Sequence, residues 1–332
     1  SITLPSGLTS IGEKAFDSCS GLSSLSFADN SKLETIGTNV FEDCSSLSSI
    51  SFGNNSSLKK ISDFAFTTCH GLSSVSFGAD SQLNTIGNSA FSGCSNLKSV
   101  SFGADSQLKT IGDSAFYGCS RLSSITLPSG VTDIGKSAFY GCSSLTSINF
   151  ESENANYTSI DGILFSKDGS TLIQYPIGKQ ETSYEIPASV TTIGNSAFEG
   201  GNYLEVVTAA SGSQLTTIGD YAFKSSSRLF SIALPSNVTN IGTEAFSGCS
   251  SLSSVSFDDN SKLETIGTDV FRGCISLSSL SFGANSQLKS IGNSAFSGCS
   301  NLERVSFGAN SQLETIGNSA FSGCSSLSSI AI

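Results

Sequence analysis

Apolar side chains recur along this chain with a period of 25 residues. In one representative unit, residues 33–57, they stand at Leu33, Ile36, Val40, Phe41, Cys44, Leu47, Ile50 and Phe52. Ile50 and Phe52 alternate with Ser49 and Ser51, which is the period-two pattern of a strand with one buried face. Gly and Asx residues then predict a turn, and a second short extended piece of the form L-x-x-I-G follows it.

The most regular part of the unit is the motif G-x-x-A-F-x-x-C, which first occurs at residues 12–19. Neighbouring copies are 25 residues apart, except for two steps of 23 residues and one wide gap in the middle of the chain. Four or five residues hold no more than one helical turn, so the motif predicts a single turn of 3₁₀ or α helix. The Phe of the motif falls at Phe16, Phe41, Phe66, Phe91, Phe116, Phe139, Phe198, Phe223, Phe246, Phe271, Phe296 and Phe321.

A fixed period of this size predicts a solenoid, in which each coil buries its apolar residues against the next coil. Each coil is expected to add one strand to a parallel β-sheet, about 4.8 Å from its neighbour. The predicted fold class is therefore a mostly-β α/β solenoid with one parallel sheet and short 3₁₀ or helical turns. We expect one solenoid over residues 1–332. Both ends of the sequence interrupt a repeat, so we expect it to be a piece of a longer protein whose terminal caps lie outside it.

The wide gap predicts a modified coil over residues 150–187, between regular coils at 1–149 and 188–332. This segment lacks the A-F-x-x-C turn. Two apolar runs flank Lys167-Asp168-Gly169, at 163–165 and 172–175, and predict a β-hairpin. The segment is too short to have a core of its own, so it is expected to belong to the solenoid.

Composition excludes several function classes. The formal net charge is -11, from 27 acidic and 16 basic residues, and there is no basic run. Binding to nucleic acid or to an anionic membrane surface needs a positive surface, so neither is expected. No stretch approaches the roughly 18 consecutive apolar residues of a membrane-spanning helix, and no signal peptide precedes the first repeat.

Residues 127–148 carry the consensus L-P-x-x-V-T-x-I-G-x-x-A-F-x-x-C-x-x-L-x-x-I. This pattern resembles the BspA-type leucine-rich repeats of surface proteins from bacteria and some protists. The segment from Ser159 to Pro176 resembles a hairpin insert that recurs in the same family. The resemblance implies a right-handed leucine-rich-repeat solenoid at a cell surface or secreted, often adhesive, that binds host or matrix proteins. The family has no single ligand, so the resemblance implies no binding residue.

Every one of the ten cysteines stands three residues after a motif Phe, at Cys19, Cys44, Cys69, Cys94, Cys119, Cys142, Cys249, Cys274, Cys299 and Cys324. Equivalent positions on stacked coils lie about 5 Å apart with parallel Cβ vectors, whereas a disulfide needs converging Cβ atoms about 3.8 Å apart. A metal site likewise needs converging ligands. We therefore predict a ladder of reduced, buried thiols, and Gly201 and Ser226 replace Cys in two coils without leaving a partner unpaired.

Catalysis and cofactor binding have little support in the sequence. The only histidine, His70, follows Cys69 in a loop, and no G-x-S-x-G elbow, phosphate loop, zinc spacing or EF-hand loop is present. We predict no enzymatic activity, no cofactor and no metal. A row of Asx residues follows the strands and is consistent with calcium binding or with capping of the backbone, of which the sparse acids favour capping; its members are Asn30, Asn55, Asp80, Asp105, Asn260, Asn285 and Asn310.

The outward strand positions form a lattice of serines with the pattern S-x-S, which favours a polar face of low adhesiveness. An ordered-water lattice for ice binding is a distant alternative, because serine lacks the methyl group that such lattices use. The lattice comprises Ser24, Ser26, Ser49, Ser51, Ser74, Ser76, Ser99, Ser101, Ser254, Ser256, Ser279 and Ser281.

All seven tyrosines lie in the middle third of the chain, where the repeat is irregular. Tyr and Arg are enriched in interface cores, so the sequence predicts a non-enzymatic protein-binding or adhesion module with its partner site in this region. The predicted site consists of Tyr157, Tyr175, Tyr184, Tyr203, Arg228 and Phe230. Two alternatives stay open. In the first, these aromatic residues only pack the irregular coil against its neighbours. In the second, the protein is a structural solenoid whose interrupted ends join copies end to end. Tyr117 and Tyr140 follow a motif Phe and are placed on the opposite surface.

Overall fold

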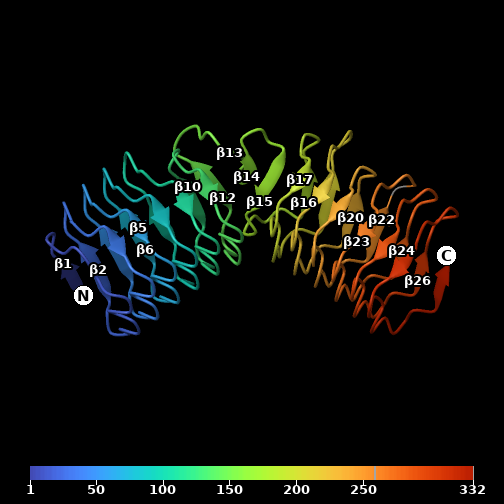
Figure 1. Ribbon diagram of the computed structural model, residues 1–332, viewed down its shortest axis with the longest axis horizontal. Coiled ribbons are helices and arrows are strands. Elements are labelled where there is room, and N and C mark those ends of the chain that lie inside the picture. The colour runs from blue at the N-terminus through green and yellow to red at the C-terminus, as the bar shows by residue number, and fades with distance from the viewer. Residues whose placement is uncertain (258, 332) are drawn as a thin grey trace. The chain divides into compact units, whose positions relative to one another are not determined.

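The computed structural model describes residues 1–257 and 259–331. The chain forms two compact units, Ser1–Lys167 and Asp168–Ile332, and each is a stack of β coils (Figure 1). The single solenoid over residues 1–332 remains a prediction, and each unit is described by itself.

Each regular coil of the first unit contributes one longer strand and one two-residue strand. The longer strands are β1 Ile2–Leu4, β2 Ser24–Phe27, β4 Ser49–Phe52, β6 Ser74–Phe77, β8 Ser99–Ser101, β10 Ser124–Leu127 and β12 Ser147–Phe150. The short strands are β3 Thr35–Ile36, β5 Lys60–Ile61, β7 Thr85–Ile86, β9 Thr110–Ile111 and β11 Asp133–Ile134. The unit ends with β13 Tyr157–Ile160 and β14 Ile163–Ser166.

The second unit repeats this arrangement. It begins with β15 Thr171–Gln174. Its longer strands are β16 Ser183–Ile186, β18 Val206–Ala209, β20 Ser231–Leu234, β22 Ser254–Phe257, β24 Ser279–Ser281, β26 Arg304–Ser306 and β28 Ser329–Ala331. Its short strands are β17 Thr192–Ile193, β19 Thr217–Ile218, β21 Asn240–Ile241, β23 Thr265–Ile266, β25 Ser290–Ile291 and β27 Thr315–Ile316.

Within each sheet the longer strands pair in parallel and in register, one coil step apart, as the repeat predicts. Ser24 aligns with Ser49, and Ile50 aligns with Val75. Serine and apolar side chains therefore form separate rows, with the apolar rows buried. The prediction of one parallel sheet is incomplete, because the L-x-x-I-G segments form further parallel sheets from strands that contain only two residues each.

The predicted turn of 3₁₀ or α helix does not form, since the described residues contain no helix. The A-F-x-x-C segment is a run of β-turns whose N–H groups alternate between two kinds of acceptor. Phe41 N–H donates to Ala65 O of the next coil at 2.9 Å, whereas Cys44 N–H donates back to Phe41 O. A helix would direct every donor along its own axis. Here the next coil supplies every second acceptor, so the segment joins the stack as a third hydrogen-bonded ladder.

The core of each unit consists of ladders of stacked phenylalanine rings. In the first unit the motif rings stack from Phe16 to Phe139, with centroids 5.0–5.7 Å apart. In the second unit they run from Phe198 to Phe321 at 4.6–5.3 Å. Each coil thus stacks its ring on the rings of the neighbouring coils, which confirms the interpretation of the repeat.

The modified coil contains an antiparallel hairpin ahead of the predicted turn at Lys167-Asp168-Gly169. Strands β13 and β14 pair antiparallel, with Ile160 opposite Ile163 across the turn at Asp161-Gly162. Both turn residues have positive φ, 52° and 78°, as two-residue hairpin turns require. The predicted turn at Lys167-Asp168 is present as a turn, and it falls at the junction of the two units.

Candidate functional site

Three of the six predicted partner-binding residues come together on the second unit. Tyr203 and Arg228 stand 25 residues apart, at the same position of neighbouring coils, as do Val206 and Ser231, which pair in register. Two positions closer to the strands, the Phe230 N–H donates to Glu205 O at 2.7 Å. These four side chains, which flank the ends of two neighbouring strands, are called the β18–β20 patch.

The β18–β20 patch is exposed and is connected by one ion pair. Phe230 is 55% exposed and Tyr203 is 36% exposed, although both are large aromatic residues. The Arg228 Nη2 and Glu205 Oε1 atoms lie 2.5 Å apart, across the two coils. This contact spans neighbouring coils and restrains the arginine beside the aromatic rings. The patch therefore presents apolar area together with a balanced pair of charges.

The patch lies one to three positions before the strands, and not on the serine lattice itself. Phe230 occupies the row of Ser48 and Ser73, whose hydroxyls donate to the preceding coil. On the strands, the lattice is interrupted at Thr208 and Ala233, which face outward. The replacement of serine by Thr208 and Ala233 is visible when the coils are aligned in sequence, but neither residue belongs to the predicted site.

A shallow hollow of about 460 Å³ lies at the other end of the same two strands. Thr208 and Ala233 line it, and its far wall is the segment Pro235–Asn237. The outward side chains of β18 and β20 thus connect the patch to this hollow. Small side chains such as Ala209, Ala210 and Gly212 form most of its surface.

Tyr175 belongs to the interior of the second unit, which corrects its predicted role in the site, and Tyr184 is half-buried beside it. Tyr175 is 2% exposed and stacks on Phe198 at 5.0 Å, so it occupies the position of a motif phenylalanine. Burial raises the pKa of its hydroxyl, which has no hydrogen-bond partner among the described residues. The Tyr184 ring packs edge-on against Tyr175 at 5.2 Å. Packing of the irregular coil, the alternative hypothesis, therefore applies to Tyr175, and a binding role of Tyr184 stays a prediction.

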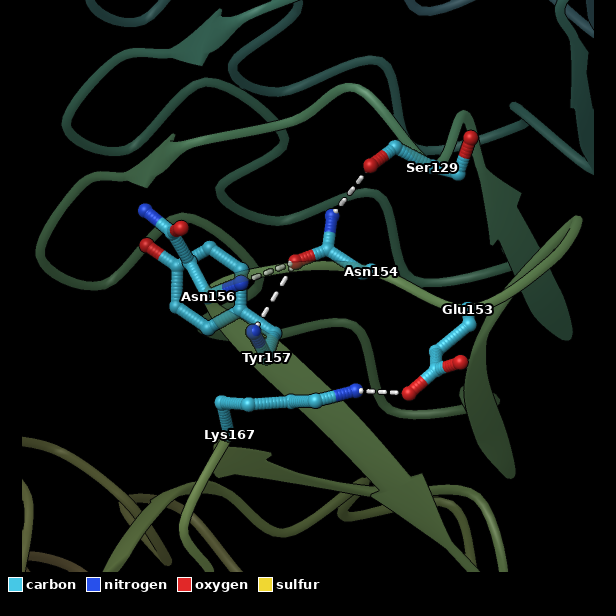
Figure 2. A network of polar contacts seen from close by, with 6 residues as sticks. All are labelled: Ser129, Glu153, Asn154, Asn156, Tyr157 and Lys167. Atoms are coloured by element: carbon cyan, nitrogen blue, oxygen red, sulfur yellow. Dashed lines mark hydrogen bonds and ion pairs between the residues drawn. The ribbon is translucent and has the colours of Figure 1, made fainter.

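Tyr157 lies in the first unit, where it closes the edge of a sheet. Its hydroxyl donates to Thr132 O and accepts from the Ile134 N–H, both at 3.1 Å. Asn154 caps the adjacent backbone by donating to Ser129 O at 2.8 Å (Figure 2). These side chains take the hydrogen-bonding places that the short strand of a regular coil would fill. Burial raises the pKa of the Tyr157 hydroxyl, so its first role is structural.

The thiol ladder is confirmed, and the structure shows what it does. All ten cysteines are free, eight of them are buried, and Cys19 and Cys324 at the ends are half-buried. From the second coil onward each Sγ donates to the carbonyl oxygen of the motif Phe of the preceding coil, as Cys69 does to Phe41 O at 3.1 Å. Burial raises the pKa of Cys94 to about 12. The buried thiols are therefore weak internal donors and not nucleophiles.

The two coils without cysteine keep this carbonyl paired by other means. The Ser226 hydroxyl donates to Phe198 O at 2.9 Å. At Gly201 no side chain is available, and the Gln174 amide donates to Tyr175 O at 3.1 Å instead. A Cβ at Gly201 would lie 3.1 Å from Phe198 O, so the missing side chain also relieves crowding.

The described residues contain no group of three His, Cys, Asp or Glu side chains placed to hold a metal ion. His70 Nδ1 lies 2.9 Å from Gly93 O in an exposed turn. In the Asx row, Asn310 Nδ2 donates to Asn285 Oδ1 at 3.1 Å. The backbone is instead capped by side chains that stand one residue before members of the row. For example, Asp29 Oδ1 accepts from the Asn54 N–H at 2.7 Å. The expected capping position is thus off by one residue.

Comparison with protein families agrees with the architecture. The family model described as BspA type leucine rich repeat region matches the chain in six copies, over residues 1–105, 59–182, 177–286 and 258–332. A comparison with curated proteins gave no match. Within the described residues, no helix is long and apolar enough to cross a membrane.

Several solved bacterial structures are similar over nearly the whole chain. The pneumococcal vaccine antigen PcpA is 26% identical, with a TM-score of 0.70, over 99% of this chain and 76% of that one. A leucine-rich repeat protein from Eubacterium ventriosum is 25% identical, with a TM-score of 0.70, over 88% and 87%. A leucine rich cell surface protein from Faecalibacterium prausnitzii is 27% identical, with a TM-score of 0.64, over 99% and 86%.

Proposed function

Because this chain belongs to the BspA-type leucine-rich-repeat family, we propose that it is a protein-binding or adhesion module at a cell surface or outside the cell. Of the similar structures, one is named as a cell surface protein and another as a vaccine antigen, which supports this location. The observation that carries the proposal is the exposed β18–β20 patch, because its Phe230 is a large exposed aromatic side chain in a row where other coils have Ser48 and Ser73.

The composition of the patch fits a protein partner. Tyr and Arg combine a large contact area with polar groups, and they are enriched where truncation costs binding energy. The Arg228–Glu205 ion pair is already formed in the free protein, which reduces the side-chain ordering that binding requires. Phe230 supplies the apolar centre between these groups. We therefore place the partner over β18 and β20, with the hollow beside Pro235 as a second contact.

The test is a triple variant, Tyr203→Ser, Arg228→Ser and Phe230→Ser, measured by surface plasmon resonance against purified matrix and cell-surface proteins. Tyr221→Ser is the matched control, because Tyr221 is also 36% exposed in the same unit but lies on the motif turn. We expect one or more partners whose binding to the triple variant is weakened at least about tenfold, since hot-spot truncations cost 2 kcal/mol or more. The control is expected to bind as the parent protein does.

Two outcomes would overturn the proposal. Equal binding by the triple variant and the parent protein would exclude the patch as the binding site. If the melting midpoint of the variant also falls, the three residues are only structural. Concentration-dependent filaments in sedimentation, with no captured protein, would favour the alternative of end-to-end assembly.

A further inference from the structure

A separate hollow of about 350 Å³ lies in the modified coil of the first unit. Its walls come from the end of β12, the loop that follows, strand β13 and Lys167 after β14. No regular coil has this combination of elements, because the hairpin replaces the usual strand and turn. The volume is at the lower end of the range of about 300–1,000 Å³ that is typical of small-ligand pockets.

One wall is aromatic and held in place. The rings of Phe150 and Tyr157 are nearly parallel, at 3°, with centroids 6.1 Å apart. Tyr157 is anchored at its hydroxyl by two backbone bonds. Asn154, which is 3% exposed, donates to Val131 O and accepts from the Tyr157 N–H, at 2.8 and 2.9 Å. This wall is therefore formed before any ligand arrives.

The other walls are polar and carry no net charge. Lys167 Nζ lies 2.7 Å from Glu153 Oε1, and Figure 2 shows the lysine reaching across to the carboxylate. This ion pair holds the pKa of Glu153 below its ordinary value. Ser159 Oγ donates to Asn149 Oδ1 at 3.2 Å on the inner side. The lining thus contains a carboxylate, an ammonium, amides and hydroxyls beside two aromatic rings.

We propose that this hollow binds a neutral saccharide unit. Sugar hydroxyls both donate and accept hydrogen bonds, so they can pair with the Glu153 carboxylate, the Lys167 ammonium and the Asn149 amide together. The apolar C–H face of a pyranose ring packs against an aromatic face such as that of Phe150. Because its lining includes one cation, already paired with a carboxylate, the hollow disfavours phosphates and other anions. The polar lining likewise disfavours a purely apolar ligand.

This site is independent of the proposed protein-binding function, because all of its residues lie in the first unit. The two proposals therefore fail separately. Loss of the β18–β20 patch is expected to leave saccharide binding unchanged.

The experiment is saturation-transfer NMR on the full chain with D-glucose, D-galactose, D-mannose and N-acetyl-D-glucosamine. N-acetylneuraminic acid serves as an anionic probe. We expect signal transfer from at least one neutral sugar, with a dissociation constant about tenfold higher in a Glu153→Gln and Lys167→Gln variant, since both lost contacts are charge-assisted. Thr158→Ala, which removes a lining hydroxyl without touching the charges, is expected to weaken binding less.

The matched control is Glu34→Gln with Lys59→Gln, an exposed ion pair of 3.1 Å in the same unit that does not line the hollow. It is expected to bind as the parent protein does, and melting midpoints verify that all variants are folded. Three results would overturn the proposal. These are no transfer from any neutral sugar, equal affinity in the Glu153 and Lys167 variant, and a preference for the anionic sugar.

Discussion

Replacing Phe91 with alanine tests whether the ring ladder holds a unit together. Phe91 is fully buried, and its ring stacks on Phe66 at 5.3 Å and on Phe116 at 5.5 Å. Truncation removes the transfer free energy of the ring, leaves a cavity, and breaks two stacked pairs. Core Phe→Ala changes cost about 3–5 kcal/mol, and stacked pairs contribute about 0.5–1.5 kcal/mol each beyond burial. We therefore expect the free energy of unfolding to fall by about 4–5 kcal/mol, at the upper end of that range.

The matched control is Phe16→Ala at the end of the same ladder. Phe16 is half-buried and stacks on one ring only, that of Phe41 at 5.0 Å. The variant loses about half as much buried ring area as Phe91→Ala and only one stacked pair. We therefore expect the free energy of unfolding to fall by about 1–2 kcal/mol. The assay is urea unfolding followed by far-UV circular dichroism, since the chain has no tryptophan. Equal losses for the two variants would refute the ladder as the source of stability, because the two sites differ both in burial and in the number of stacked neighbours.

Further expectations follow from the thiol ladder and the sheet edge. Thiol titration of the native protein should detect at most Cys19 and Cys324, the two half-buried cysteines. After denaturation it should detect all ten thiols. Protection of all ten after denaturation without a reductant would indicate disulfides. Burial raises the pKa of Cys94 from 9.0 to about 12, so its contribution to stability is complete below pH 9 and is lost as the pH rises toward 12. Urea midpoints of the reduced protein should fall across that window, and constant midpoints would contradict it. Ser226→Ala should cost about 1 kcal/mol in urea unfolding through the unpaired carbonyl, and Ser226→Cys should cost less. Tyr157→Phe removes two hydrogen bonds at the sheet edge and should lower stability by about 1–2 kcal/mol; an unchanged midpoint would mean that water replaces the hydroxyl.

Much of the candidate chemistry could be read from the repeat alone. The cysteines occupy one position of each coil, and that position is interior, so their reduced and buried state follows from the spacing. The replacement of cysteine by Ser226 keeps the same donor, as the chemistry of a hydroxyl suggests. In contrast, no sequence pattern identifies Gln174 as the donor that compensates for Gly201. That pairing depends on how the irregular coil places an amide beside Tyr175 O.

The tyrosines show why composition locates a region but not a surface. Tyr175 and Tyr203 are equally good interface residues by type, yet one is in the ring ladder and the other is exposed. Their positions relative to the motif explain the difference, since Tyr175 substitutes for a motif Phe in a coil that lacks the A-F-x-x-C sequence. The hollow that contains Glu153 and Lys167 has no sequence signal, because its walls meet only when the hairpin folds against β12.

By itself the sequence determined the coil, its period, its buried positions and its family, because each of these is a local pattern repeated many times. Only the tertiary structure decided the conformation of the A-F-x-x-C turn and the exposure of each aromatic residue in the irregular coil. The physical reason is the same for both. A backbone donor or a side chain in a solenoid is satisfied by the adjacent coil, so its state depends on the coil placed beside it. The Phe41 N–H, which bonds to Ala65 O and not within a helix, is the simplest example.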